Sequence, residues 1–365
     1  MDLLNVTTTY REMVKKYGNF RAPTVEITVG GTKLVSGAKM NVTEVEVELS
    51  CEGEASGCVF HIAGEYKPKN TNFSSDIDRF QIGETVQVEL GYIRLEKVFS
   101  GYINQVDYDF NFNGKGFAIR VDGIDAKGLL MKNQRMEISK ENSVADLVNK
   151  LLGEQPVSSY LEGKSVDSSP KKEIKDQANT MNDYDLISDH ASKIGYEFFI
   201  SQGKAHFRPR QKNTSPVIKL SPKHGIFEAK FTLSGQQLFK TAEARAVDDG
   251  SGKKTSGKAD IVGKFSKGGT AEKMMGPSKQ VFQDADIKDT KGAQAIAENK
   301  LVKATESFGA LELNCVGIPE IGPARFIELE EMSEMLNRKY YVTSVSHKMN
   351  DEGYRTTIKA RVSGL

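Results

Sequence analysis

Residues 82–110 read IGETVQVELGYIRLEKVFSGYINQVDYDF, and residues 321–349 read IGPARFIELEEMSEMLNRKYYVTSVSHKM. Aligned without a gap, the two stretches share six identical positions at one constant spacing. The shared features are the Ile-Gly start, a Glu-Leu pair and a segment that begins with Tyr102 in the first copy and Tyr341 in the second. The chain therefore contains an internal repeat.

Each copy continues into a turn and then into a strand in which two kinds of residue alternate. In the second copy one side carries Tyr354, Thr356, Ile358, Ala360 and Val362, and the other carries Arg355, Thr357, Lys359 and Arg361. A period of two places one face inward and one face in solvent, which is typical of an antiparallel strand with one wet face. Each copy is thus a β-meander, too small to be stable alone. The repeat predicts two related β-domains.

Length and charge narrow the class of protein. The 365 residues leave room for two or three domains, and 50 basic residues against 49 acidic ones give no bias towards nucleic acid. The three cysteines, Cys51, Cys58 and Cys315, are too few for a disulfide framework. No apolar run approaches the roughly 20 residues of a membrane span, and the N-terminus lacks the features of a secretion signal. We expect a protein made in the cytoplasm, without stable membrane insertion.

Up to about residue 130 the chain reads as one helix followed by short strands. The helix covers Tyr10 to Tyr17, and Gly30-Gly31 after a strand at 24–29 is a hairpin signal. Alternating runs predict further strands at 42–49, 59–62, 86–90, 98–110 and 117–124. Six or seven strands with short turns are enough to close a small barrel or a sandwich.

From Met131 the period of the apolar residues changes from two to 3.6. Ser143 is a predicted N-cap for a helix that Gly153 ends. The apolar face of this helix is formed by Val144, Leu147, Val148, Leu151 and Leu152. A second helix begins near Asn182 or Asp183 and ends at Gly195, and a hairpin follows between residues 196 and 207. We expect a small α/β module inserted between the repeats.

A second β region begins near Pro216, with strands predicted at 226–233 and 238–247 as the first half of a second barrel. Residues 250–279 are rich in Gly and Ser and contain seven lysines, so we predict a mobile loop there. A last helix is predicted at 291–304, and a strand at 311–316 leads into the second meander.

One segment comes close to a nucleotide-binding motif. Residues 252–259 match a phosphate-cradling P-loop except at Ala259, which cannot supply the hydroxyl that ligates Mg²⁺. The motif also needs a helix after it, whereas glycines and lysines follow here. A solvated basic loop is the preferred interpretation, and a loop that docks on a partner is the alternative.

Metal binding and acid–base catalysis are considered and declined. Cys51, Cys58 and His61 offer three soft ligands, but no fourth stands nearby and the cysteine spacing is wider than in zinc sites. Asp122 and Asp125 form a candidate acid–base pair. Such residues more often end a strand and open a turn, which is the interpretation we prefer. We expect no catalytic residue, no cofactor, no metal and no enzymatic activity.

The histidines also lack a recognisable catalytic partner. They are scattered among different predicted elements, without a Ser, Cys or carboxylate at a motif spacing. His347 shares a strand face with Val345 and Met349, where a packed or hydrogen-bonded histidine is the default.

Taken in order, three groups of residues resemble the phage late control gene D family, the baseplate hub proteins of contractile tails, which are equivalent to the N-terminal hub portion of VgrG. Residues 82–88 with 98–103 resemble the family's "F-x-G-x-I" element, and 182–187 with 195–199 its "D-x-D-F-L…G-Y-x-F" helix and hairpin. Residues 341–347 with 353–357 resemble its closing hairpin, "Y-x-V-x-x-V-x-H…G-Y-x-T". Residues 321–324 depart from the pattern, because the family usually has its glycine after Pro323.

The resemblance implies a homotrimer in which each chain holds two tube-type antiparallel β-barrels. The barrels would cover residues 1–130 and 213–365, the second with the flexible loop at about 250–280, and the α/β module residues 131–212. The expected fold class is α+β, mainly β. The trimer would join a hexameric tail tube to a separate trimeric spike protein within a virion or injection-particle baseplate, next to other baseplate proteins and the tape measure. The residues expected in structural or interface roles are Gly83, Gly101, Tyr102, Ile103, Val106, Tyr341, Val342, Val345, Lys359 and Arg361.

The sequence is also compatible with two other functions. One is a hub or host-contact protein of a non-contractile phage tail, and the other is an enzyme such as a cell-wall hydrolase. The sequence does not separate a phage from a tailocin or a cellular injection system.

Overall fold

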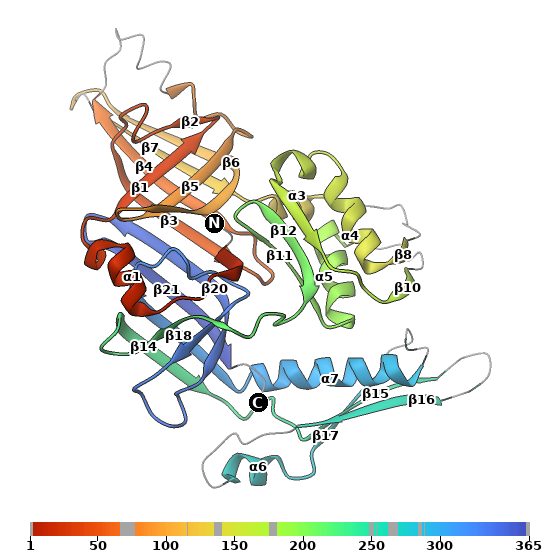
Figure 1. The fold of residues 1–365 in the computed structure, drawn as a ribbon. Coiled ribbons are helices and arrows are strands. Elements are labelled where there is room, and N and C mark those ends of the chain that lie inside the picture. Colours follow the sequence, from red (N-terminus) through yellow and green to blue (C-terminus); the bar gives the residue numbers. More distant parts are fainter. Residues whose placement is uncertain are drawn as a thin grey trace.

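The computed structural model describes residues 3–65, 77–114, 116–134, 141–174, 181–247, 252, 254–261, 269–283, 287 and 289–362. Antiparallel strands dominate it, helices are fewer, and the predicted α+β, mainly β class is confirmed. Figure 1 shows a large curved sheet, a compact α/β module beside it, and a long helix lying on a smaller sheet.

The first half of the large sheet contains the strands predicted before residue 130. They are β1 (Thr24–Val29), β2 (Thr32–Lys33), β3 (Val42–Ser50), β4 (Gly57–Glu65), β5 (Thr85–Gly91), β6 (Leu95–Asn111) and β7 (Gly116–Ile124). The Gly-Gly signal is confirmed: Gly30 and Gly31 both have positive φ, and Val29 pairs with Thr32 across the turn. The predicted helix is α1 (Tyr10–Lys16), which begins with a capping box between Thr9 and Glu12.

The second half repeats the antiparallel meander of the first, but the strand at its edge pairs in parallel, unlike the corresponding strand of the first half. Its strands are β13 (Pro216–Leu220), β14 (Ile226–Leu233), β18 (Gly309–Val316), β19 (Phe326–Leu329), β20 (Lys339–Asn350) and β21 (Gly353–Val362). The β6–β7 ladder is irregular between Ile103 and Gln105, and the β20–β21 ladder between Val342 and Ser344, which are the matching positions of the repeat. The two meanders therefore share their bulge as well as their sequence.

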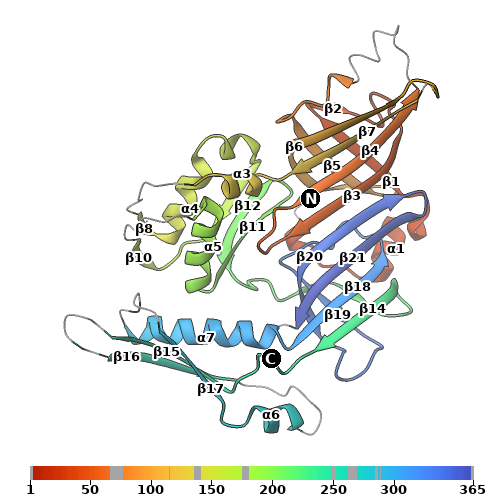
Figure 2. The ribbon, with the colours of Figure 1, turned by 180° about the vertical axis from the view of Figure 1, so that it is seen from behind.

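The two halves form one continuous sheet. Residues Val45–Ser50 of β3 pair antiparallel with Ser344–Met349 of β20, so the strand order runs β14-β18-β21-β20-β3-β4-β7-β6-β5-β1-β2. Figure 2 shows β3 and β20 side by side at this junction. A single apolar core contains residues of both halves, such as Ile27, Val121 and Ile358. We name the β3–β20 ladder the internal joint.

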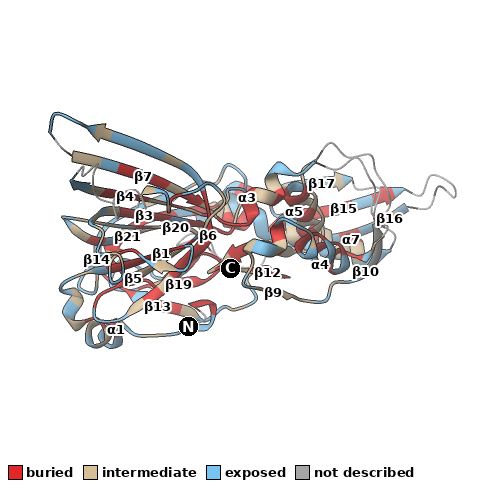
Figure 3. Cartoon of the chain, turned by 90° about the horizontal axis from the view of Figure 1, so that it is seen from above, coloured by how far each residue is buried: buried red, intermediate tan, exposed pale blue. Residues whose placement is uncertain are grey.

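Between the two halves lies a module with an apolar core of its own. Its elements are α3 (Lys127–Lys132), β8 (Glu141–Ser143), α4 (Val144–Gly153), the short 3₁₀ helix η3 (Val157–Tyr160), β9 (Gly163–Val166), β10 (Lys171–Ile174), α5 (Asp183–Lys193), β11 (Tyr196–Ser201) and β12 (Lys204–Pro209). The predicted N-caps are confirmed, because Ser143 accepts from the N–H of Asp146 and Asn182 from that of Asp185. Figure 3 shows this second group of buried residues beside those of the large sheet. The domain boundaries themselves remain a prediction.

The segment after residue 238 differs from the prediction in two ways. It forms a separate three-stranded sheet, β16-β15-β17, and not part of the large sheet. Its elements are β15 (Thr241–Val247), β16 (Lys254–Asp260), α6 (Thr270–Met275) and β17 (Lys279–Gln283), and α7 (Thr290–Glu306) packs on it. The predicted mobile loop at 250–279 is therefore wrong for residues 254–260 and 269–279; residues 250, 251, 253 and 262–268 lie outside the described part of the chain.

The physical reason for this difference is a face of small residues. Ala242, Ala244 and Ala246 of β15 and Ala259 of β16 face α7, where Ala293 and Ala297 are fully buried. Gly257 is required at this interface, because a Cβ there would lie 2.2 Å from the backbone nitrogen of Gln294. Alternation of small residues with lysines resembles a loop in sequence, yet it allows a helix to approach a sheet closely.

Candidate functional site: the joint around the 50–56 turn

The turn between β3 and β4, residues 50–56, lies where the large sheet, the inserted module and the end of α7 meet. It begins with Ser50, the last residue of β3, which pairs with Ser344 at one end of the internal joint. Side chains of α3, α5 and β21 contact it, together with Arg210 directly after β12, as described below. We name this set of contacts the hub joint.

Lys127 of α3 holds the backbone of the turn. Its side chain is fully buried, and its Nζ donates to the carbonyl oxygens of Ser50 (3.2 Å) and Glu52 (2.8 Å). The hydroxyl of Tyr184 donates to the same Glu52 carbonyl at 3.0 Å, and the ammonium lies 5.2 Å from the Tyr184 ring centroid. Burial lowers the pKa of Lys127, while the charge of Asp125 opposes this shift. The module is thereby fixed to the sheet through polar contacts that are shielded from water.

Asp125 and Asp122 have separate structural partners. The N–H of Asp125 donates to the Ser56 carbonyl at 2.9 Å, and its Oδ1 accepts from the N–H of Lys127 at 3.1 Å. Burial raises the pKa of Asp125 to about 6. Asp122 lies within β7 and forms an ion pair of 3.0 Å with Arg120. Asp125 thus opens the turn after a strand, as preferred in the sequence analysis.

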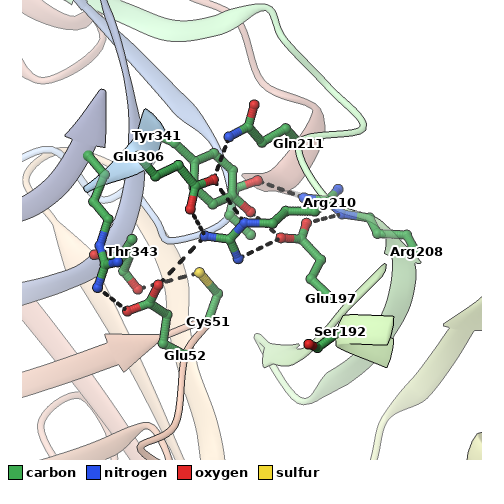
Figure 4. A network of polar contacts seen from close by, with 12 residues as sticks. Cys51, Glu52, Ser192, Glu197, Arg208, Arg210, Gln211, Glu306, Tyr341 and Thr343 are labelled. Atoms are coloured by element: carbon green, nitrogen blue, oxygen red, sulfur yellow. Dashed lines mark hydrogen bonds and ion pairs between the residues drawn. The ribbon is translucent and has the colours of Figure 1, made fainter. Parts of the chain in front are cut away.

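A network of charged side chains fills the rest of the hub joint (Figure 4). On the module, Arg208 Nε donates to Glu197 Oε1 at 2.9 Å, and the Tyr341 hydroxyl of β20 donates to the other oxygen of Glu197. Burial raises the pKa of Glu197, although Arg208 opposes this shift, and burial also raises the pKa of Tyr341. Arg208 further donates to the Ala324 carbonyl at 2.6 Å, which connects the module to the second meander.

Arg210 connects the module to the end of α7. Its Nε and one terminal nitrogen donate to the two oxygens of Glu306, each at 3.0 Å, and Gln211 donates to Glu306 at 2.8 Å. Burial disfavours the charge of Arg210, but the hydrogen bonds and charge of Glu306 outweigh it and raise the pKa of Arg210. Glu52 lies 3.6 Å from Arg210 and 3.2 Å from Arg361 of β21. Bidentate arginine pairs of this kind fix orientation as well as distance.

The N-terminus is attached close by through Arg325. This side chain is fully buried and donates to the carbonyl oxygens of Leu3 (3.0 Å) and Val6 (2.6 Å). The preceding residue, Ala324, has φ of 61°, in the left-handed region that favours glycine. This is the position after Pro323 where the late control gene D pattern has its glycine, so the backbone keeps that conformation without the glycine.

The predicted structural and interface residues fall into two groups. Eight lie in the aligned stretches 82–110 and 321–349, where Tyr102, Ile103, Tyr341, Val342 and Val345 are buried and Val106 is partly buried. Gly83 has φ of 87°, and a Cβ on Gly101 would lie 2.2 Å from the Ile124 carbonyl oxygen. Lys359 and Arg361 line an open groove of about 510 Å³ together with residues of the 50–56 turn and β14. A role of these ten residues in contacts between chains remains a prediction.

The thiols and His347 are packed into the interior. Cys51, Cys58 and Cys315 are free and buried, and burial raises the pKa of Cys51 to about 12, which leaves it protonated and unreactive. His347 accepts from the Tyr354 hydroxyl at 2.9 Å and donates from Nε2 to the Ile321 carbonyl at 3.0 Å. Burial lowers the pKa of His347 to about 4. The expectation of a hydrogen-bonded histidine is confirmed.

Among the described residues no three His, Cys, Asp or Glu side chains are grouped so that they could hold a metal ion. No helix in the described ranges is long and apolar enough to cross a membrane. Residues 254–260, which end the P-loop-like motif, form the strand β16.

Sequence reasoning did not identify Glu197, Arg208, Arg210 and Glu306. The only local signal is that Glu197 and Arg208 interrupt otherwise apolar stretches of β11 and β12, where a charged residue is buried only if it is paired. Glu197 and Arg208 lie opposite each other in the β11–β12 hairpin, but the further partners Tyr341 and Glu306 are distant in sequence, so those contacts follow only from the fold.

The fold is shared with solved structures of tail proteins. A 43 kDa tail protein of prophage MuSo2 from Shewanella oneidensis aligns with a TM-score of 0.68 at 15% identity, over 93% of this chain and 98% of that one. A tail protein from Neisseria meningitidis MC58 also aligns with a TM-score of 0.68 at 13% identity, over 93% of this chain and 97% of that one. An Escherichia coli component of the type VI secretion system aligns with a TM-score of 0.57 at 11% identity, over 89% of this chain and 76% of that one. That component is described as structurally similar to the T4 bacteriophage tail proteins gp27 and gp5.

These similarities define the class: the chain has the fold of these tail proteins and of this secretion-system component. It belongs to the Alg8 N-terminal domain family, whose model matches residues 19–351. The matched family model is not that of late control gene D, so membership of that family stays a prediction. A comparison with curated protein sequences gives no match.

Proposed function

We propose that the protein is a structural baseplate hub of a contractile tail or injection particle, a trimer that joins a hexameric tail tube to a separate trimeric spike. The single observation that carries this proposal is the internal repeat, because its two copies share the strand order and a bulge at matching positions. Three chains with two similar units each present six quasi-equivalent units to a sixfold tube and keep threefold symmetry towards a spike.

The hub joint supports a structural role. Its buried charges link the sheet, the module and α7, and each of the principal ones has a partner of opposite charge. Such a network holds parts in a fixed relative position, which an adaptor under load needs, whereas an acid–base site needs a carboxylate or histidine exposed to a substrate. The shared fold with tail proteins and a type VI secretion component supports the same role.

The proposal is tested by assembly with the neighbouring components. The purified protein is mixed with the tail tube protein and the spike protein encoded beside it, and the tubes are viewed by electron microscopy. We expect tubes that carry a cap at one end only when this protein is present. Tubes that stay uncapped in the presence of both partners would contradict a hub function.

The two other functions have their own tests. A hub or host-contact protein of a non-contractile tail would be encoded beside tube and tape-measure genes without a sheath gene. A cell-wall hydrolase would release sugar or peptide from purified cell walls, and Asp122→Ala or Asp125→Ala would abolish that release. We expect no release, because each carboxylate has a structural contact through one of its oxygens, Asp122 with Arg120 and Asp125 with the N–H of Lys127.

A further inference from the structure

Residues 3–8 contact both the inserted module and the second half of the large sheet, and we name this segment the strap. In the described ranges it pairs with no strand. Its last contact with the sheet is a single hydrogen bond of 2.8 Å from the N–H of Thr8 to the Val217 carbonyl of β13. Leu3 and Leu4 are nevertheless buried, each 5% exposed. The strap is therefore buried like a core element but attached by few backbone contacts.

Two side chains from separate parts of the fold hold the backbone of the strap. The N–H of Leu3 donates to Gln202 Oε1, in the β11–β12 turn of the module, at 3.2 Å. The buried guanidinium of Arg325 donates to the carbonyl oxygens of Leu3 at 3.0 Å and of Val6 at 2.6 Å. Because these bonds go to peptide groups, they recognise two carbonyls three residues apart and not a particular side chain.

Both holding side chains are placed by unusual backbone conformations. Gln202 has φ of 52°, and Ala324, directly before Arg325, has φ of 61°. Residues other than glycine adopt this left-handed region rarely, and they keep it only where the surrounding structure requires it. The amide nitrogen of Gln202 also donates to the Lys97 carbonyl of β6. Its side chain is thus oriented by the first half of the large sheet, independently of the strap.

The side chain of Leu4 completes a small apolar cluster, which we name the Leu4 cluster. This cluster is separate from the main core of the large sheet and from that of the module. Its members come from the strap, the 50–56 turn, the module and the second meander: Leu4, Cys51, Phe199, Ala324, Phe326 and Tyr341. Leu4 is one of only six members, so its departure would open this cluster and leave both larger cores intact.

We propose that the strap is an exchangeable clasp: residues 3–8 occupy a peptide-binding site formed by Gln202, Arg325 and the Leu4 cluster, and they leave and re-enter it while the rest of the chain stays folded. The ligand of this site is a short peptide with an apolar side chain next to the first carbonyl that Arg325 holds. The closed strap fixes the module to the second half, and the open strap releases that connection. The inference does not rest on the hub function.

Cys51 reports the opening of the strap, because it lies in the Leu4 cluster, whereas Cys58 and Cys315 lie in the main core. Burial raises the pKa of each thiol, so a maleimide reacts with a thiol only after its surroundings open. In the folded protein Cys51 should react well before the other two. Reaction of all three at one rate would show that opening is global, and it would overturn the proposal.

Leu4→Ala tests the apolar contact. It should speed the labelling of Cys51 by about thirtyfold or more, because it empties the cluster beneath the strap. Labelling of Cys58 and Cys315 should not change. The matched control is Leu238→Ala, which removes a leucine that is 8% exposed from another cluster. The control should leave Cys51 as slow as in the wild type, and equal acceleration in both variants would contradict the assignment.

Gln202→Asn tests the hold on the backbone without opening a cavity. Asparagine tolerates the left-handed conformation of this position, but its side chain is one methylene shorter and does not reach the N–H of Leu3. Labelling of Cys51 should rise by about fivefold, as expected for the loss of one hydrogen bond. Unchanged labelling would show that Gln202 does not hold the strap.

A peptide supplied in trans tests the site itself. The probe is residues 3–9, acetylated so that Leu3 keeps an amide N–H. Added to the Leu4→Ala protein, whose own strap is weakened, it should slow the labelling of Cys51 in a saturable way. The same peptide with Leu4→Ala is the control and should give no protection. Absence of protection up to the solubility limit of the peptide, or equal protection by both peptides, would overturn the exchangeable site.

Discussion

At the residue scale, the hub joint depends on charges that are buried in pairs. The carboxylate of Glu306 is 2% exposed and receives both nitrogens of Arg210. Removal of one partner leaves the other charge buried without a counter-charge in a region of low dielectric. The resulting loss of stability is larger than the net stabilisation that the intact pair provides. Exposed pairs behave differently, because water and salt screen them.

Arg210→Ala should therefore lower the free energy of unfolding by about 3–5 kcal/mol, measured by urea titration. The matched control is Arg120→Ala, which removes an ion pair whose arginine is 43% exposed. The control should cost no more than about 1 kcal/mol. Equal effects of the two variants would show that Arg210 does not hold the module in place.

Asp125 makes a pH-dependent contribution to stability. Its pKa is raised to about 6 in the folded protein and is about 3.9 in an unfolded chain. Between these values the unfolded state ionises while the folded state keeps its proton, so stability falls as pH rises from about 4 to 6 and is level above that. The loss is roughly 2–3 kcal/mol. Asp125→Asn should remove this loss in urea titrations at several pH values, and an unchanged pH profile would contradict the assignment.

At the element scale, alternation and helix signals predicted most of the secondary structure. The strands of both meanders, the caps at Ser143 and Asn182 and the helix ending at Gly195 were found as expected, because each depends on neighbouring residues. The sheet β16-β15-β17 was missed, since its face of alanines and a glycine carries almost no apolar signal. The internal joint was also missed, because its strands β3 and β20 lie far apart in sequence. The contacts of the charged network with Tyr341 and Glu306 were missed for the same reason, since they join residues from separate parts of the chain.

Gly257 should be a sensitive position of the α7 interface. Gly257→Ala places a methyl group 2.2 Å from the Gln294 backbone nitrogen, so the helix must move away from β16. We expect the local stability of this unit to fall by about 1–3 kcal/mol. Hydrogen exchange should become faster in β15, β16 and α7 and stay unchanged in the large sheet. Gly163→Ala is the control, because its nearest heavy atom would lie 3.9 Å away. Unchanged exchange in Gly257→Ala would show that the close approach is not required.

At the scale of the whole molecule, two related halves share one sheet. They are joined by β3 and β20, which pair antiparallel. In the proposed hub, three such chains with two similar units each present six units in a ring of threefold symmetry. This is the arrangement that an adaptor between a hexameric tube and a trimeric spike requires.

Imaging of the assembled tail tip by electron cryomicroscopy tests this account most directly. It should show three copies of the chain in a ring, with residues 82–124 and 321–362 superposing after a rotation of about 60°, as six units in a ring require. Six copies of the chain, or two meanders related by a rotation far from this value, would contradict the account.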